Sequence, residues 1–392
     1  VDRIGNKNIY YNYSNKKIFF CSEQSYMFKS GFLKFEINQN KVDEHIVFGD
    51  IAGSQTLHNN ILKLQQGEVL VYDFMKIELH SYYKLDKFVI SSDNSEKKNN
   101  IKDSIEEIKS TITSTINTWT NNCAYKKSIL LSGGIDSGLI AMLLSNKTKK
   151  LTSYTAKFSS YTSSNPYNEE SEINELVKDY NIKKNMITCS EEALLTSLSE
   201  IYSSFNEPSP SNSLLLNTLT KSMSKKNDHK ICFTGDGADE VFGGYERHIT
   251  IANKYKNNND NNVIAMGYNY LSVNRLKKFF QKDFKTPKLR LSYLENLKNV
   301  SLVNKILLYD LKFYLPMFLR SMEQIGMASS IEYRSPFTDY KLIEESFRLN
   351  DKFKIFKFSN KFILKKVFSA IGNKTIIKKR KFEDPYIEKQ FN

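Results

Sequence analysis

Residues 128–144 constrain the fold of this chain more than any other segment. The apolar run 129–131 predicts a buried strand, and the small-residue turn 132–137 leads into an apolar helix. Gly133 and Gly134 let the backbone approach a ligand closely. Because the first N–H groups of a helix lack intrahelical partners, such a turn favours an anion. The segment predicts a phosphate-sized turn at the end of a strand.

The carboxylate of Asp136 is unusual for a simple anion site, because it repels phosphate. A Mg²⁺ ion placed between the carboxylate and phosphate oxygens removes this conflict. No Lys follows the glycines, so the segment is not the G-x-x-x-x-G-K-[ST] loop of P-loop enzymes. The alternative is an ordinary glycine turn in which Asp136 caps a helix.

A second strand and glycine turn lie further along the chain. Residues 231–234 predict a strand, and Gly235, Asp236, Gly237 and Asp239 follow it. In a parallel sheet both turns lie at the carboxyl edge of the strands. Two acidic turns that face one pocket suit a Mg²⁺ ion on a triphosphate, with Asp136 and Asp239 as ligands. The alternative is a turn that merely tolerates acidic residues.

The region around these turns alternates between strands and helices. Isoleucines spaced three or four apart predict an amphipathic helix over residues 101–119. Residues 151–158 and 181–188 predict further strands, with a helix over 168–180 between them. The expected fold class is therefore α/β with a parallel sheet, and the chain beyond the polar insertion 256–262 is expected to be helical.

The first 90 residues have a different character. Short β-rich runs at 9–13, 17–21, 67–72 and 76–83 predict one antiparallel sheet, with a single short helix near 22–28. Residues 91–100 are polar and of low complexity, which predicts a linker. The expected domains are residues 1–90 and 103–392, with a linker over 91–102.

The composition limits which classes of partner and which cellular compartment are expected. The chain has 392 residues and a formal net charge of +14. No stripe of Arg with interleaved aromatic residues is present, so a nucleic-acid partner is not predicted. The scattered cysteines lack metal-binding spacing, which predicts reduced thiols in the cytoplasm. No apolar run reaches about 18 residues and no signal peptide is recognised, so no membrane partner is expected. Because residue 1 is Val, either the start is processed or an N-terminal part is missing.

Several motifs now support a resemblance to known families. The S-G-G-I-D-S turn at 132–137 resembles the pyrophosphate loop of the ATP pyrophosphatase superfamily, whose members cleave ATP between its α and β phosphates. Residues 234–245 resemble the S/T-G-D/E-G-x-D-E-x-F-G-G-Y pattern of asparagine synthetases. Residues 331–339 resemble the L-E-x-R-x-P-F-L-D pattern of that family, and 378–382 resemble its R-K-K-x-G-F run.

This resemblance implies a set of site residues and the cofactors ATP and Mg²⁺. The implied ATP-binding residues are Leu131, Ser132, Gly133, Gly134, Asp136, Ser137, Ala156, Thr234 and Gly235. Asp136 and Asp239 are the implied metal ligands, and Asp236, Glu332 and Lys381 the implied catalytic residues. Lys381 would neutralise charge that develops on the phosphates. For Arg334, a structural salt bridge and a substrate contact both stay open.

The N-terminal part resembles the closing third of a class II glutamine amidotransferase domain. The resemblance covers D-R-I-G-N-K at residues 2–7, F-C-S-E at 20–23 and L-Q-Q-G at 64–67, with Asn8 in place of a proline. That family uses an N-terminal Cys nucleophile that lies ahead of these motifs. The given chain is therefore not expected to hydrolyse glutamine, and its ammonia would come from a missing or separate glutaminase part. Cys21 is interpreted as a packed thiol.

The resemblance implies an asparagine synthetase-type ligase that adenylates a carboxylate and transfers ammonia to it. Aspartate is the default acceptor, and a homodimer stays open. Related enzymes on this scaffold close β-lactams, cyclise lasso peptides or amidate sugar acids of surface polysaccharides. Two other classes also stay open, namely a non-catalytic subunit that docks a glutaminase and a tRNA-modifying ATP pyrophosphatase.

Overall fold

A computed structural model of the protein describes residues 1–93, 97–121, 125–148, 150–158, 169–205, 207–210, 212–225, 229–254, 260–268 and 273–372. The chain packs into two compact units. The first unit is drawn from residues 1–94, 199–211 and 251–324, and the second from 95–198, 212–250 and 325–392. The packing units thus divide the chain differently from the domain limits expected from the sequence, which stay a prediction.

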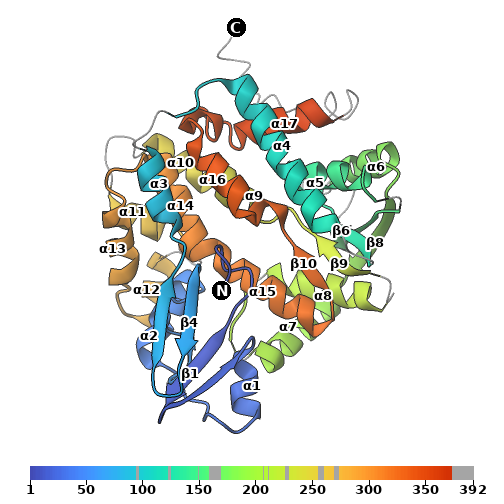
Figure 1. The fold of residues 1–392 in the computed structure, drawn as a ribbon. Coiled ribbons are helices and arrows are strands. Elements are labelled where there is room, and N and C mark those ends of the chain that lie inside the picture. Colours follow the sequence, from blue (N-terminus) through green and yellow to red (C-terminus); the bar gives the residue numbers. More distant parts are fainter. Residues whose placement is uncertain are drawn as a thin grey trace. The chain divides into compact units, whose positions relative to one another are not determined.

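A five-stranded parallel sheet in the order β10-β9-β6-β7-β8 forms the centre of the second unit (Figure 1). Its strands are β6 (Lys126–Leu130), β7 (Thr152–Phe158), β8 (Lys183–Cys189), β9 (His229–Phe233) and β10 (Glu332–Arg334). The predicted α/β class with a parallel sheet is confirmed. Because β7 pairs with one edge of β6 and β9 with the other, the winding of the sheet reverses beside β6. Ligand crevices form at such reversal points.

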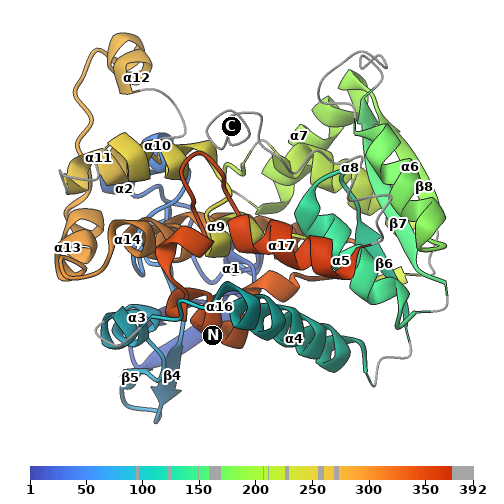
Figure 2. The ribbon, with the colours of Figure 1, turned by 90° about the horizontal axis from the view of Figure 1, so that it is seen from above.

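The helices of the second unit surround this sheet (Figure 2). They are α4 (Ile101–Thr120), α5 (Ile135–Ser145), α6 (Glu170–Asp179), α8 (Asn212–Ser224), α9 (Ala238–Phe242), α16 (Tyr340–Arg348) and α17 (Phe362–Ile371), with 3₁₀ turns at Pro336–Thr338 and Asp351–Phe353. Neighbouring residues of β10 contact different helices: the Tyr333 hydroxyl bonds Thr220 of α8, and Arg334 donates to the Trp119 carbonyl of α4. Because successive strand residues point to opposite faces, α4 and α8 lie on opposite faces of the sheet.

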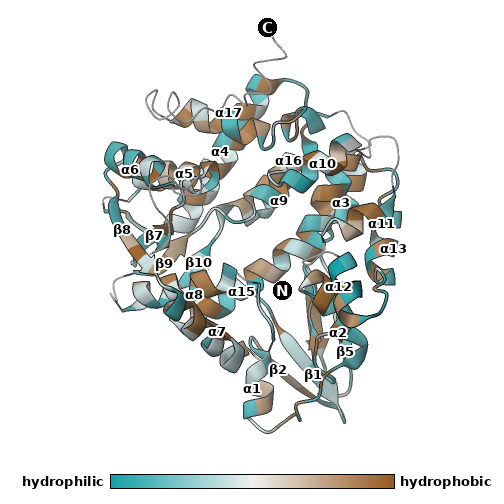
Figure 3. Ribbon diagram, turned by 180° about the vertical axis from the view of Figure 1, so that it is seen from behind, coloured by the Kyte–Doolittle hydropathy of each residue, from teal (hydrophilic) through white to brown (hydrophobic). Residues whose placement is uncertain are grey.

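Helix α4 matches the helix predicted from the isoleucine spacing. Ile108, Ile112 and Ile116 are fully buried, and the side chain of Asn100 caps the first turn by accepting a hydrogen bond from the Lys102 amide. Helix α17 packs against α4 and α5, and its ribbon alternates between hydrophobic and hydrophilic residues (Figure 3). This packing positions the start of α17, which becomes important below.

The first unit contains two small antiparallel sheets where the sequence predicted one. Strands β1 (Tyr10–Ser14), β2 (Lys17–Cys21) and β3 (Leu62–Lys63) form one sheet, and β4 (Glu68–Tyr72) and β5 (Ile77–Ser81) form the other. The four predicted strands are present. However, β3 occupies the free edge of β1, and a strand of two residues is too short to leave an alternating pattern. Cys21 packs against a core cluster of this unit, as predicted for a structural thiol.

The prediction of a single short helix in the first 90 residues was wrong. Helix α1 (Gln24–Lys29) fits it, but α2 (Gln39–Phe48) and α3 (Leu85–Asp93) were not predicted. The buried face of α2 includes Glu44, whose carboxylate accepts hydrogen bonds from Arg290 and from the Ala52 amide. A helix that buries an acid against a distant Arg lacks a simple apolar stripe, so its periodicity is hidden. Helix α3 also extends to Asp93, into the predicted linker.

The rest of the first unit is helical, as expected beyond the polar insertion. Its helices are α11 (Asn261–Met266), α12 (Val273–Phe280), α13 (Lys288–Asn296), α14 (Leu302–Tyr309) and a π-helical turn at Asp310–Tyr314. Helices α7 (Glu191–Phe205), α10 (Glu246–Lys254) and α15 (Leu315–Ala328) contribute residues to both units. None of the helices in the described ranges is long and apolar enough to cross a membrane.

A buried group of charges joins distant segments of the first unit. The carboxylate of Asp50 accepts from Arg320 at 2.9 Å and from Lys63 at 3.2 Å. Burial alone would raise the pKa of Asp50, but the charges of Arg320 and Lys63 outweigh burial and hold this pKa well below its usual value. Asp50 is thus stabilised as an anion inside the unit.

Candidate functional site

The first glycine turn closes on itself through two serine side chains. The Ser132 and Ser137 hydroxyls lie 3.0 Å apart, and the Ser137 hydroxyl also accepts from the Ser132 amide at 3.1 Å. The Gly134 amide donates to the Ser132 hydroxyl at 3.1 Å. Helix α5 begins directly after this turn, at Ile135, without a side-chain cap. The turn therefore presents the start of a helix at the carboxyl end of β6, as predicted.

A carboxylate that was not predicted occupies one amide of this turn. The Gly133 amide donates to the Glu169 carboxylate at 2.8 Å. A Cβ atom at position 133 would lie only 2.4 Å from the Glu169 Cβ atom, so the approach requires glycine. Glu169 is exposed and directly precedes α6. The amide of Gly133 thus already binds an anionic group of the protein itself.

The second glycine turn packs directly on the first. A Cβ atom on Gly235 would lie 2.8 Å from the Ser137 nitrogen and 2.9 Å from the Asp136 Cβ atom. Thr234 is buried, and its hydroxyl lies 2.7 Å from the Ser335 hydroxyl. Gly237 has a φ of +89° where α9 begins, a conformation that favours glycine. The sheet therefore brings together the two turns that were singled out from the sequence.

A lysine joins the carboxylates of the two turns. The Lys361 ammonium lies 2.5 Å from Asp136 Oδ2 and 2.7 Å from Asp239 Oδ1. Lys361 is buried and has a positive φ of 47° just before α17. Gly244 makes room for the pair, because a Cβ atom there would lie 1.8 Å from Asp239 Oδ1 and 2.0 Å from Lys361 Cε. Backbone strain and a required glycine at one ion pair are typical of a functional site.

The electrostatics of this group differ from an ordinary salt bridge. Burial raises the pKa of Asp136 to about 6, with Lys361 lowering it and Asp239 adding to the rise. Burial also raises the pKa of Asp236, against the opposing effect of the Thr234 hydroxyl. Burial would lower the pKa of Lys361, but the two aspartates outweigh it and raise this pKa. The site therefore gathers more negative than positive charge.

The group has the features of a site that accepts a divalent cation together with phosphates. Asp136 Oδ1 is buried without a hydrogen-bond partner among the described residues. Mg²⁺ typically takes one or two carboxylates and completes its shell with waters and phosphate oxygens. Among the described residues no group of three or more His, Cys, Asp or Glu side chains could hold a metal. Asp136 and Asp239 thus fit Mg²⁺ that arrives with a nucleotide, and do not form a closed metal site.

Two further residues predicted to bind ATP, Leu131 and Ala156, share one edge of the sheet. Leu131 follows β6, and its carbonyl accepts from the Thr155 hydroxyl at 2.6 Å. Ala156 is the next residue of β7, pairs with Ile187 of β8 and is partly buried. Both residues lie near the carboxyl ends of their strands, as the prediction requires. Their contact with a nucleotide stays a prediction.

Among the described residues, one predicted catalytic residue pairs away from this group. Glu332 begins β10 and pairs with Arg334, whose Nε donates to it at 3.0 Å. Arg334 therefore forms a salt bridge, which is one of the two roles that the sequence left open for it. The catalytic role of Glu332 stays a prediction. Lys381 lies outside the described residues.

Comparisons with known proteins decide the family. The sequence profile of the family described as "Asparagine synthase" matches residues 125–390. The chain belongs to the asparagine synthase family. The profile described as "Glutamine amidotransferase domain" matches residues 1–83. The resemblance stated from the motifs is confirmed.

Curated members of the asparagine synthase family are similar at low identity. A putative asparagine synthetase (glutamine-hydrolysing) 2 of Methanocaldococcus jannaschii is 26% identical over 255 residues, which cover 63% of this chain and 47% of that protein. Asparagine synthetase (glutamine-hydrolysing) 1 of Bacillus subtilis is 21% identical over 422 residues, covering 98% of this chain and 64% of that protein. The chain thus spans about half to two thirds of the length of these relatives.

A solved structure with partial similarity is the U34-tRNA thiolase NcsA from Methanococcus maripaludis with its [4Fe-4S] cluster. It shows 14% identity and a TM-score of 0.30, covering 55% of this chain and 78% of that chain. A similarity this weak supports no conclusion about this member of the asparagine synthase family.

Sequence reasoning missed two residues that contact the glycine turns. Lys361 lies 225 positions after Asp136, and no role was assigned to it from the sequence. Glu169 belongs to a run of acidic residues before α6 that resembles an ordinary helix start. The available signal was that each glycine turn carries an acidic residue with no basic residue beside it in the sequence. A buried carboxylate needs a cation, so a basic residue from elsewhere in the chain was to be expected.

Proposed function

We propose that this chain adenylates a carboxylate with Mg-ATP, releases pyrophosphate, and forms an amide with ammonia. Aspartate is the proposed acceptor, and asparagine the product. One observation carries the proposal: two acidic glycine turns meet at the sheet edge, with Asp136 and Asp239 sharing Lys361. A turn that merely tolerates acids needs neither the shared lysine nor the glycine at position 244 that makes room for it.

The proposed reaction has two steps. An oxygen of the acceptor carboxylate attacks the α-phosphorus of ATP, and the bond to the bridging oxygen breaks to release pyrophosphate. The nitrogen of ammonia then attacks the acyl carbon, AMP leaves with the electron pair of the broken C–O bond, and the nitrogen loses a proton. Adenylation converts a poor electrophile into a good one, so ammonia can displace AMP.

The residues of the two turns take distinct parts in this proposal. The turn 132–137 binds the pyrophosphate portion through backbone amides at the start of α5, and Thr234 and Gly235 lie against the nucleotide. Asp136 and Asp239 hold Mg²⁺, which supplies positive charge to the phosphate oxygens when bound. Asp236 is proposed to lie near the acyl-adenylate. Glu332 and Lys381 keep their proposed catalytic roles, with Lys381 balancing charge on the phosphates.

Lys361 and Glu169 extend the proposal. The Lys361 ammonium holds the two aspartates together, and it would be available to the phosphates if Asp136 and Asp239 held Mg²⁺. The Glu169 carboxylate leaves the Gly133 amide when a phosphate oxygen binds there. A bound Mg-triphosphate would offer a cation in place of the Lys361 ammonium and an anion in place of the Glu169 carboxylate.

The test is pyrophosphate release from Mg-ATP with an ammonium salt as the nitrogen donor, measured with and without aspartate. We expect aspartate-dependent release that Asp136→Ala abolishes. Asp103→Asn, at an exposed acid in the first turn of α4, serves as the matched control and is expected to retain the activity. Ammonium bypasses the glutaminase, so the assay isolates the synthetase chemistry.

A calorimetric titration with Mg-ATP accompanies the assay. Failure to bind Mg-ATP would overturn the proposal as a whole. Binding without any response to aspartate would instead contradict aspartate as acceptor and leave adenylation of another carboxylate, for which sugar acids and peptide carboxylates are the next substrates to assay.

A further inference from the structure

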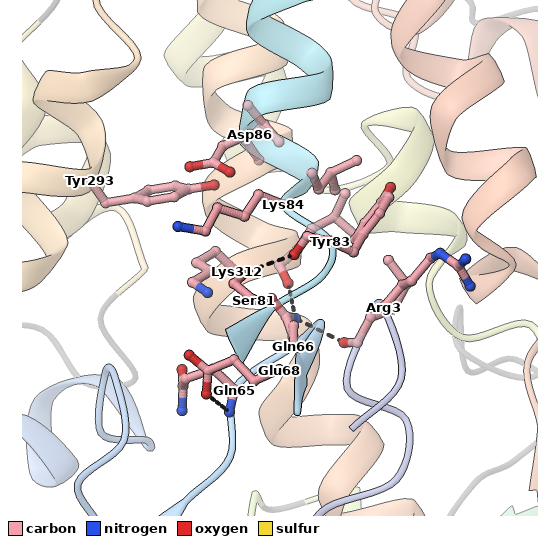
Figure 4. Close-up of a pocket in the computed structure, with 14 residues that line it drawn as sticks. Arg3, Gln65, Gln66, Glu68, Ser81, Tyr83, Lys84, Asp86, Tyr293 and Lys312 are labelled. Carbon is pink, nitrogen blue, oxygen red and sulfur yellow. Dashed lines mark hydrogen bonds between the residues drawn. The ribbon is translucent and has the colours of Figure 1, made fainter. Parts of the chain in front are cut away.

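The first unit contains a cavity of about 220 Å³ that is lined only by its own residues (Figure 4). At about 30 Å³ per water molecule, this volume equals the space of about seven waters. The lining comes from the N-terminal segment, β4 with the residues before it, β5, α3 with the loop before it, α13, α14 and the π-helical turn at Asp310–Tyr314. The cavity is thus large enough for a small polar metabolite and too small for a nucleotide.

Charges of both signs face this cavity. In Figure 4 the tips of Lys84, Lys312, Asp86 and Tyr293 lie on one side of it, and the Glu68 carboxylate lies below them. The Arg3 guanidinium points away from this group and lies over the rings of Tyr82 and Tyr83. Two ammonium groups and two carboxylates therefore line the cavity. Each carboxylate accepts one backbone hydrogen bond, Glu68 from the Gln65 amide and Asp86 from the Lys87 amide, and keeps its charge for a bound molecule.

Lys312 is the least expected of these groups. Burial lowers its pKa, although Asp86 and Glu68 oppose this effect. Within the described ranges its ammonium makes no hydrogen bond or ion pair shorter than 4 Å, whereas Lys63 of the same unit pairs with Asp50. A partly buried ammonium without a partner is costly, and such a cost is often retained where a ligand supplies the partner.

The backbone that carries Lys312 is also unusual. Residues Asp310–Tyr314 form a π-helical turn between α14 and α15. The carbonyl of Leu311 accepts from the Gln66 side chain at 2.7 Å, and the same amide group donates to the Ile4 carbonyl at 2.8 Å. Single π turns inside α-helices occur frequently at functional sites. The turn and Lys312 are independent observations that point to the same cavity.

The chemistry of the lining selects the class of ligand. Phosphate or sulfate is disfavoured, because Glu68 and Asp86 face the same space as the lysines. An apolar ligand would leave the four charged groups unpaired. A metal is disfavoured too, because no suitable group of ligands exists in the described part of the chain. A small molecule that carries one positive and one negative charge pairs with both kinds of side chain.

We propose that this cavity binds a small α-amino acid, with its carboxylate on Lys312 and Lys84 and its ammonium group on Asp86. The hydroxyl of Tyr293 then lies beside the side chain of a polar amino acid. This site belongs to the first unit and does not depend on the proposed ligase reaction.

The test is a calorimetric titration of the 392-residue chain with L-asparagine, in the absence of ATP. Two analogues separate the charges: succinamate lacks the ammonium group, and 3-aminopropanamide lacks the carboxylate. We expect each analogue to bind at least tenfold more weakly than L-asparagine. Lys312→Met and Asp86→Asn should each weaken L-asparagine binding at least tenfold, while Lys298→Met, at an exposed position, should not.

A second measurement protects the test against misfolded variants. Urea unfolding without ligand should show Lys312→Met at least as stable as the parent, because the change removes an ammonium with no partner. L-asparagine binding that is undiminished in Lys312→Met, or binding of either analogue as tight as that of L-asparagine, would overturn the proposal. So would the absence of any binding by L-asparagine and L-alanine up to about 10 mM. The Mg-ATP titration is read separately, so failure of one proposal does not affect the other.

Discussion

Asp50 and Asp136 are both buried aspartates beside cations, yet their electrostatics are opposite. Asp50 of the first unit faces two cations, Arg320 and Lys63, and its pKa is held well below the usual value. Asp136 of the second unit shares the single cation Lys361 with Asp239, and burial raises its pKa to about 6. The cations around Asp50 balance its negative charge, whereas the single lysine beside Asp136 and Asp239 does not balance both carboxylates.

The difference separates structural charge from functional charge. The cations around Asp50 leave nothing for a ligand to add. Asp136 Oδ1, in contrast, is buried without a partner among the described residues, so a cation from outside gains more there. A carboxylate with a shifted pKa is a better indicator of function when no neighbouring cation of the protein balances its charge.

The largest expected effect is on stability, at Asp50. Asp50→Asn should lower the free energy of unfolding by about 3–5 kcal/mol, because Arg320 and Lys63 are left buried without their anion. Asp43→Asn is the matched control, since Asp43 pairs with Lys282 at an exposed position and should cost less than about 1 kcal/mol. Urea unfolding measures both. Equal losses for the two variants would contradict the structural role of the Asp50 cluster.

Asp136→Asn should show the reverse pattern. We expect pyrophosphate release to fall by about 10²–10³-fold, the usual cost of removing one electrostatic group from an active site. The free energy of unfolding should stay the same or increase, because one of two carboxylates that compete for Lys361 is gone. Steady-state assays and urea unfolding on the same preparations check this. A large loss of stability would place Asp136 in the same class as Asp50.

The pH dependence of stability should have opposite signs at the two sites. Because the pKa of Asp136 rises from 3.8 to about 6 on folding, the folded state retains a proton that the unfolded state releases. Stability should therefore fall by about 3 kcal/mol as pH rises from about 4 to 6, at 1.36 kcal/mol per pKa unit. Asp50 acts in the opposite direction, because folding lowers its pKa. Its charged carboxylate stabilises the fold above the pKa of the unfolded state, and this stabilisation is lost as the pH falls below about 4.

Urea unfolding of the parent and of Asp136→Asn across pH 4–7 isolates the first effect. The difference between the two proteins should be absent near pH 4 and should grow in favour of Asp136→Asn up to about pH 6. A difference that is constant with pH would show that Asp136 does not titrate in this range.

The smallest expected effect concerns the space around Lys361. Gly244→Ala would place a Cβ atom 1.8 Å from Asp239 Oδ1 and 2.0 Å from Lys361 Cε, so the ion pair must shift. We expect a loss of about 1–3 kcal/mol in stability, as for overpacking of a core, and weaker Mg-ATP binding. Gly267→Ala, where the nearest atom is a flexible Ile251 methyl at 3.1 Å, is the control. Unchanged Mg-ATP affinity in Gly244→Ala would contradict the role of the lysine.

Local patterns were enough to predict the elements that carry the two glycine turns. The apolar run before Ser132 and the isoleucines of α4 encode their structure within one strand or a few helical turns. The same local rules failed for α2, because its buried Glu44 depends on Arg290, which lies 246 positions further along the chain. Hydrophobic periodicity in the sequence reveals a buried helix face only when the buried side chains are apolar.

The sequence by itself determined the α/β class, the two acidic glycine turns and the family to which they belong. Only the tertiary structure decided that Lys361 joins Asp136 to Asp239, that Glu169 meets the Gly133 amide, and that Asp50 is fully compensated. The physical reason is range. Turns and strands follow from neighbouring residues, whereas the charge that an aspartate meets inside a protein comes from segments that only folding brings together.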